Sequence, residues 1–155
     1  MPKRTKPKKR RRPDLSNPNS KTWLIKADDL WADVIKQVGE CEVCGTEGTQ
    51  RKKDGAMVVG LQAHHLILRG RHKYRHNVSN GICLCIACHG AHPNFRNNKR
   101  CAHGSDEARQ AFMDWLEAER QGVFQWLQEH KDDKRKPEKT YKQCYEELKE
   151  IKNEA

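Results

Sequence analysis

The chain has few of the residues that build a large apolar core. Hydrophobic residues make up 35% of its 155 positions and aromatic residues 6%, whereas 34% of the positions are charged. No apolar run is long enough for a membrane span or for the core of a secretory signal peptide, so we expect neither, and we expect a cytoplasmic protein. A core this small predicts one modest domain with extensions, stabilised by disulfides or by a metal ion.

Acidic residues are scarce in two segments of the chain. Residues 1–13 carry eight Lys or Arg and no acid, and residues 51–100 carry ten against Asp54 alone, within a net charge of +10. Such concentrated positive charge is typical of proteins that bind a phosphate backbone. A solvated tail would explain residues 1–13 equally well. The middle segment is the stronger indication, because it also holds most of the histidines.

The seven cysteines include two CxxC pairs, Cys41 with Cys44 and Cys85 with Cys88. Together the pairs supply the four thiolates of a closed tetrahedral zinc site, which leaves the ion no open position for chemistry. An oxidised disulfide framework is the alternative, but a chain without a signal peptide favours metal binding. Cys83 competes with Cys85 as a ligand, although the spacing favours Cys85 and predicts a small buried side chain at Cys83.

Three histidines, His64, His65 and His89, lie close in sequence to the predicted zinc site. A structural metal beside a second group of nitrogen ligands suggests a small metal-dependent nuclease. Adjacent residues of a strand point to opposite faces, so one of the paired histidines could instead be packed and hydrogen-bonded. Cys101 and His103 could hold a further metal, but two residues are too few to predict one.

The pattern of apolar residues predicts an α+β chain in three parts. We expect a disordered basic tail over 1–19, a zinc-stapled domain over 20–104 and a helical extension over 105–155. The expected elements are a helix over 26–38, strands over 58–65 and 81–85, a basic loop over 69–80, and helices from 86, 105 and 137. Ser105 is a suitable N-cap for the helix that follows it.

The order of these features resembles the HNH endonuclease family, including its phage-encoded members. The residues that carry the resemblance span about a third of the chain: Cys41, Cys44, His64, His65, Asn80, Cys85, Cys88 and His89. The resemblance implies a small ββα-metal core stapled by the four-cysteine zinc site and flanked by an N-terminal helix and C-terminal helices. It also implies metal-assisted hydrolysis of DNA phosphodiester bonds by nicking or double-strand cleavage, in the host cytoplasm if the chain is phage-encoded.

The resemblance also implies individual roles. His65 matches the general base, and His64 and His89 match two ligands of a catalytic divalent ion, which we expect to be Mg²⁺, Mn²⁺, Ni²⁺ or Zn²⁺. Asn80 matches the central Asn of the motif, which braces the loop and orients His65; alternatively, Asn80 before Gly81 is an ordinary hairpin residue. Relatives often place a third His four residues after the first helix His, where this chain has Pro93. His92 is therefore a candidate third ligand.

Partners follow from charge and from the resemblance. We expect phosphate contacts from four side chains of the basic loop: Arg69, Arg71, Lys73 and Arg75. The acidic C-terminal helices indicate packing or a protein partner rather than DNA binding, and the oligomeric state stays open. The alternative function is a zinc-stapled nucleic-acid-binding module without catalysis. A redox protein using its CxxC pairs is a third interpretation, which predicts reversible disulfides and no tightly held zinc.

Overall fold

The computed structural model describes residues 12–50, 58–91, 94 and 98–155. Its elements are, in order, α1 (Lys21–Lys36), β1 (Thr49–Gln50), β2 (Val58–Val59), β3 (Leu61–His65), the 3₁₀ turn η1 (Val78–Asn80), β4 (Gly81–Cys85), α2 (Ile86–His89), α3 (Asp106–Glu119), α4 (Gln121–His130) and α5 (Tyr141–Glu154). Helices and short antiparallel sheets together confirm the α+β class. Among these residues, no helix is long and apolar enough to span a membrane.

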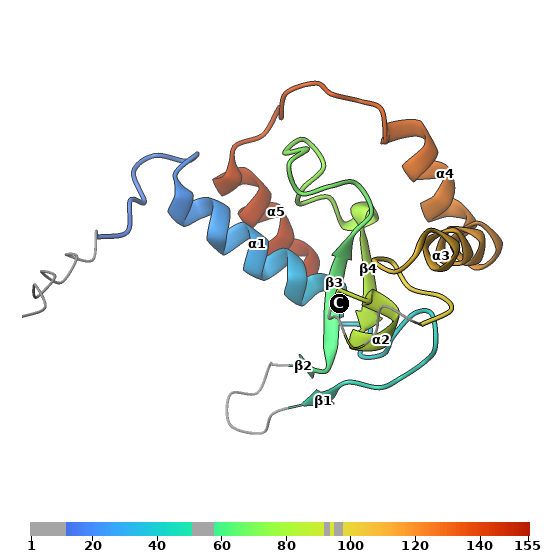
Figure 1. The fold of residues 1–155 in the computed structure, drawn as a ribbon. Helices are drawn as coiled ribbons and strands as arrows, with labels where there is room; N and C mark the ends of the chain where they lie inside the picture. Colours follow the sequence, from blue (N-terminus) through green and yellow to red (C-terminus); the bar gives the residue numbers. More distant parts are fainter. Residues whose placement is uncertain (1–11, 51–57, 92–93, 95–97) are drawn as a thin grey trace, which may run out of the picture.

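An antiparallel pair of strands, β3 and β4, lies at the centre of the fold (Figure 1). Its register pairs Leu61 with Cys85 at one end and His65 with Gly81 at the other. Every residue of β4 is buried, and α2 follows it directly. The single strand predicted over 58–65 is divided into β2 and β3 because Gly60 adopts a positive φ of 89°, which interrupts the extended backbone.

Helices flank this hairpin on both sides: α1 and α5 lie on one side, and α3 and α4 lie on the other (Figure 1). α1 begins five residues earlier than predicted, because the Ser20 side chain accepts a hydrogen bond from the Trp23 amide and caps the helix there. The helix predicted from Ser105 onward is two helices, since Arg120 leaves the helical region at φ −130° and ψ 52°. The last helix starts at Tyr141, after the predicted Pro137.

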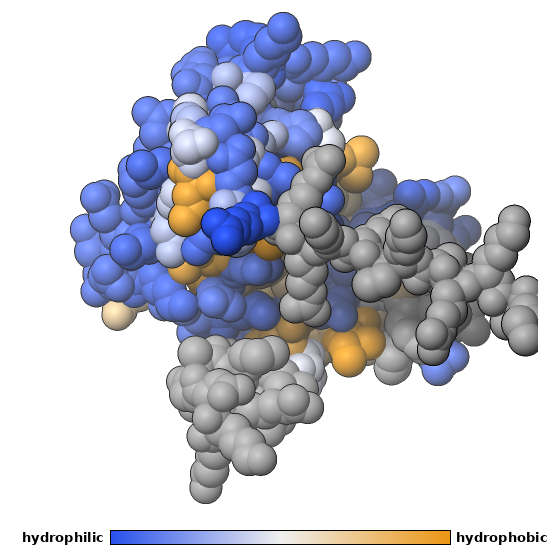
Figure 2. Space-filling view, turned by 90° about the vertical axis from the view of Figure 1, so that its left-hand side faces the viewer, coloured by the Kyte–Doolittle hydropathy of each residue, from blue (hydrophilic) through white to orange (hydrophobic). Residues whose placement is uncertain are grey.

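The hydrophobic core crosses the boundary predicted between residues 104 and 105. Leu61, Ile82 and Leu84 of the hairpin belong to the same buried cluster as Phe112 and Leu116 of α3. In the predicted tail, residues 1–11 lie outside the described residues. The Pro18 carbonyl accepts a hydrogen bond from the Lys142 amide at 3.0 Å, so the end of this segment contacts the start of α5. One face of the molecule is mainly hydrophilic with small apolar patches (Figure 2).

Candidate functional site

The two CxxC pairs converge into one cluster of four sulfur atoms. The sulfur atoms of Cys41, Cys44, Cys85 and Cys88 all lie within 4.8 Å of one another, and those of Cys44 and Cys85 are 3.7 Å apart. A tetrahedral zinc site with Zn–S bonds of ~2.3 Å has sulfur atoms about 3.8 Å apart. The cluster therefore has the ligand type and size to hold a metal such as zinc.

Local turns bring each pair of thiols together. In the first pair, Gly45 takes a positive φ of 75° and its amide donates to the Cys41 carbonyl at 2.8 Å. In the second, the Cys88 amide lies 3.5 Å from the Cys85 sulfur at the start of α2. A hydrogen bond from Cys88 lowers the pKa of Cys41 to about 4 and raises the pKa of Cys88 itself. Cys83 is fully buried and outside the cluster, as predicted.

Three histidines form a second cluster of metal-ligand type. The ligating nitrogens of His64, His89 and His103 lie within 4.8 Å of one another. His64 is near the end of β3 and His89 is the last residue of α2. The His103 amide donates to the His89 carbonyl at 3.0 Å, which lays the chain before α3 along α2 and brings His103 to the cluster.

His103 is the residue that sequence reasoning missed. The sequence places it near Cys101 as a possible pair of metal ligands, but Cys101 is fully buried and packs close to Gly90. No regular spacing links His103 to His89, so the sequence offered no signal beyond the presence of a histidine. His92, a candidate third ligand from the sequence, lies outside the described residues.

Burial keeps the imidazoles of His64 and His89 neutral at neutral pH. His64 is 9% exposed, and burial together with the nearby His89 lowers its pKa to about 3. Burial and the neighbouring His103 lower the pKa of His89 to about 4. The Nδ1 atom of His89 is buried and has no hydrogen-bond partner among the described residues. Because a buried nitrogen without a partner is costly, this atom fits the role of a metal ligand.

His65 faces a different neighbour from His64 but borders the same cleft. Its Nε2 lies 2.9 Å from the Arg75 carbonyl oxygen, and its ring stacks on Trp31 with centroids 3.8 Å apart and planes 14° apart. Since a carbonyl only accepts, Nε2 carries the proton and a neutral ring has its lone pair on Nδ1. Burial lowers the pKa of His65, which favours that neutral form.

The four histidines line one open cleft of about 650 Å³, called the histidine cleft below. Trp31 and Asp28 of α1 form one wall, and Leu68 and Arg69 of the chain after β3 form another. The cleft thus brings three nitrogens of metal-ligand type beside a fourth imidazole.

Asn80 is fully buried and binds the chain that follows β3. Its Oδ1 accepts from the Ile67 amide at 2.6 Å, and its Nδ2 donates to the carbonyls of Ile67 and Tyr74, both at 3.1 Å. Asn80 thus braces the segment from Ile67 to Tyr74, which directly precedes Arg75. These contacts are not those of a two-residue hairpin turn, since β3 and β4 are joined by the longer segment that Asn80 contacts.

The four basic residues expected to contact phosphate differ in their surroundings. The Arg75 and Lys73 side chains are 11% and 13% exposed and pair with Asp28 and Asp133, respectively. Arg71 donates to the Asp133 carbonyl at 3.2 Å. Of the four, Arg69 alone lines the histidine cleft, with its side chain 63% exposed. Its position makes it the best placed to meet a phosphate in that cleft.

No protein-family model, curated protein or solved structure matches the chain. Assignment of a function therefore rests on the residues and on their geometry. The two clusters differ in a way that separates their roles: the cysteines can fill a coordination sphere, whereas three histidines leave a position open.

Proposed function

We propose that the chain is a metal-dependent endonuclease of the HNH type that hydrolyses DNA phosphodiester bonds. The observation that carries the proposal is the histidine cleft, where three ligand-type imidazoles lie beside a fourth, that of His65, whose Nε2 contacts the Arg75 carbonyl. The four-cysteine cluster has a structural role in this proposal. A metal there would join the turn of Cys41 and Cys44 to β4 and α2, and would thereby support α2, which carries His89, and β4, the partner of the strand that carries His64.

His65 acts as the general base in this scheme. With Nε2–H donated to the Arg75 carbonyl, Nδ1 is the atom that accepts a proton from the water attacking the scissile phosphate. Its lowered pKa leaves the imidazole unprotonated and ready to accept that proton at neutral pH. Arg69, exposed at the rim, neutralises a phosphate oxygen and helps to place the substrate.

His64, His89 and His103 would hold the divalent ion. When bound, such an ion supplies a Lewis acid that neutralises charge on the phosphoryl group and on the leaving 3′ oxygen. Three imidazole ligands suit Mn²⁺, Ni²⁺ or Zn²⁺ better than Mg²⁺, which prefers oxygen ligands. This donor set ranks the ions expected from the sequence without excluding any of them.

Net charge supports nucleic acid as the substrate, since residues 51–100 carry ten basic side chains and one acidic one. The second candidate function, a zinc-stapled binding module without catalysis, uses the same charges. In that module the stacking of His65 on Trp31 and its hydrogen bond through Nε2 would only stabilise the fold, and removal of the imidazole would slow no reaction. His65 therefore separates the two candidates.

The test is cleavage of supercoiled plasmid with added Mg²⁺, Mn²⁺ or Ni²⁺ by the native chain, His65→Ala and His72→Ala, each with confirmed zinc content. His72 is a matched control, because it is half-buried and hydrogen-bonded to Tyr141 but does not line the histidine cleft. Loss of a general base slows a reaction by ~10²- to 10⁴-fold. We expect that loss in His65→Ala and native rates in His72→Ala.

Two other outcomes would contradict the proposal. Tight DNA binding by the native chain without cleavage under any of the ions would favour the binding module. Equal cleavage by the native chain and His65→Ala would indicate a contaminant or a wrong assignment of the base.

A further inference from the structure

The helix α1 precedes both candidate metal sites in sequence, yet it packs directly on His65, the proposed general base. Trp31 is 2% exposed, stacks on His65, and donates from Nε1 to the Asn77 carbonyl at 3.0 Å. Gly81, the strand partner of His65, allows this approach. A Cβ at Gly81 would lie 2.3 Å from Cδ1 of Ile35 and 2.8 Å from Cζ2 of Trp31. The glycine therefore lets α1 lie against the hairpin beside His65.

Asp28 lies three residues before Trp31 on the same face of α1, and it binds the side chains of Arg75 and His76. Its two carboxylate oxygens accept from Nε and Nη2 of Arg75, both at 2.7 Å, and Oδ1 also lies 2.8 Å from Nε2 of His76. Burial opposes ionisation of Asp28, but the hydrogen bonds from His76 and Arg75 outweigh it and hold the pKa of the carboxyl below its usual value. Asp28 is thus a charged anchor for Arg75.

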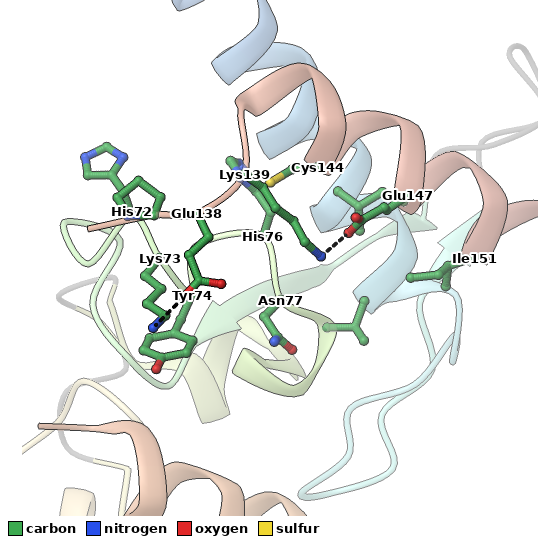
Figure 3. A pocket seen from close by; sticks show the side chains of 13 residues that line it. His72, Lys73, Tyr74, His76, Asn77, Glu138, Lys139, Cys144, Glu147 and Ile151 are labelled. Atoms are coloured by element: carbon green, nitrogen blue, oxygen red, sulfur yellow. Dashed lines mark hydrogen bonds and ion pairs between the residues drawn. The ribbon is translucent and has the colours of Figure 1, made fainter. Parts of the chain in front are cut away.

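Arg75 links this anchor to the base, because its side chain is held by Asp28 and its carbonyl oxygen accepts the Nε2–H of His65. Behind this part of the loop lies a cavity of about 360 Å³, lined by Tyr74, His76 and Asn77 and by α5 (Figure 3). The loop is therefore not packed tightly from behind. Its position depends on polar contacts, with Asn80 holding Tyr74 and Asp28 holding Arg75.

We propose that Asp28 is a positioning residue for the reaction: by fixing Arg75, it holds the carbonyl that sets the tautomer and ring orientation of His65. This inference rests on the proposed function and deepens it. It assigns α1 to the catalytic machinery, with Asp28 acting through Arg75 and Trp31 supporting the ring face. It also gives Arg75 an internal role in place of a phosphate contact.

The test compares Asp28→Asn with Asp33→Asn in steady-state cleavage of plasmid. Asp33 is the matched control, because it also lies on α1 and forms an ion pair, with Lys152 at 3.4 Å. Unlike Asp28, it lines no part of the histidine cleft. Both substitutions remove one negative charge, but Asp28 also pairs with Arg69, whose Nη2 lies 3.5 Å from its Oδ2, so Asp28→Asn alone also frees a cation of the histidine cleft. A misplacement of ~1 Å in a catalytic group can cost 10²-fold. We expect Asp28→Asn to lower kcat by ~10- to 100-fold relative to Asp33→Asn, whereas an effect exerted only through the freed Arg69 would change KM and leave kcat unchanged.

A second background shows whether Asp28 acts through the base. In His65→Ala, the further change Asp28→Asn should alter the residual rate by less than about twofold, because residues that act as a unit are not additive. If Asp28→Asn does not fold, Arg75→Lys serves instead, since it keeps the positive charge but loses the two-bond contact with Asp28. That variant should lower kcat, whereas a phosphate contact at Arg75 would predict a raised KM.

A spectroscopic readout keeps this inference separate from the proposed function. Nitrogen NMR of the zinc-loaded native chain should show His65 as the Nε2–H tautomer, and Asp28→Asn should show a mixture of tautomers. An unchanged tautomer in Asp28→Asn, an unchanged kcat, or an equal loss of rate in the His65→Ala background would each overturn the role of Asp28. Absence of cleavage by the native chain would overturn the proposed function instead, and the tautomer would still test the anchor.

Discussion

Replacement of Asn80 by alanine tests the brace that shapes the candidate site. Asn80 is fully buried and contacts Ile67, which is 4% exposed, and Tyr74, which is 5% exposed. Alanine removes the bonds to the Ile67 amide, the Ile67 carbonyl and the Tyr74 carbonyl. The Tyr74 carbonyl keeps a second partner, the Asn77 amide at 3.1 Å. Two backbone groups of Ile67 are therefore left without the partner that Asn80 provides.

The magnitude follows from those two groups. Each buried polar group left unpaired costs ~1–3 kcal/mol, and the space left by the side chain adds to this cost. We therefore expect Asn80→Ala to lower the free energy of unfolding by ~3–5 kcal/mol. A small domain has only ~5–15 kcal/mol in total, so the loss should be plain in an unfolding curve.

Denaturant unfolding of the zinc-loaded protein, followed by circular dichroism, measures this loss. Asn77→Ala is the matched control, because Asn77 is exposed and its side chain makes a single bond, accepting from the Ser79 amide at 2.9 Å. Loss of such a cap costs ~1 kcal/mol. Equal destabilisation by the two substitutions would refute the view that Asn80 is the internal brace of the loop.

Three further predictions concern the histidines and the packing of α1. Because the pKa values of His64 and His89 are held at about 3 and 4 in the folded chain, the unfolded chain binds more protons below its ordinary histidine pKa. With no divalent ion added, the contribution of these histidines to the free energy of unfolding should therefore be fully present above about pH 6.5. It should fall toward pH 4 by up to ~1.4 kcal/mol per pH unit for each histidine. A urea midpoint that does not change between about pH 7.5 and about pH 5 would contradict this. His103→Ala should weaken binding of a divalent ion to the histidine cluster by at least ~10-fold in calorimetry while leaving the zinc content unchanged, and unaltered affinity would remove His103 from the ligand set. Gly81→Ala should destabilise the fold by ~1–3 kcal/mol through contact with Ile35, and a thermal midpoint equal to that of the native chain would show that α1 is not held so closely.

The predictions from the sequence were most accurate for features that depend on residues close together in the chain. The strand over 81–85 was placed correctly, and the four cysteines come together as expected. The boundaries of other elements were less accurate. Ser20 starts α1 before the apolar stripe that indicated the helix, and Arg120 interrupts a helical pattern that continues on both sides. Caps and breaks depend on a few backbone angles, which hydrophobic periodicity does not report.

By itself, the sequence determined which side chains can be ligands or a base: the two CxxC pairs, the paired histidines and the histidine after the last cysteine. Residue type and local spacing are sufficient for that, because they limit which atoms can meet one ion. Only the tertiary structure decided that His103 joins the histidine cluster and that Arg75 turns to Asp28, 47 residues away in sequence. It also placed Trp31 on the ring of His65. These contacts depend on how α1 and the segment before α3 pack against the hairpin, and packing between distant segments leaves no periodic signal in the chain.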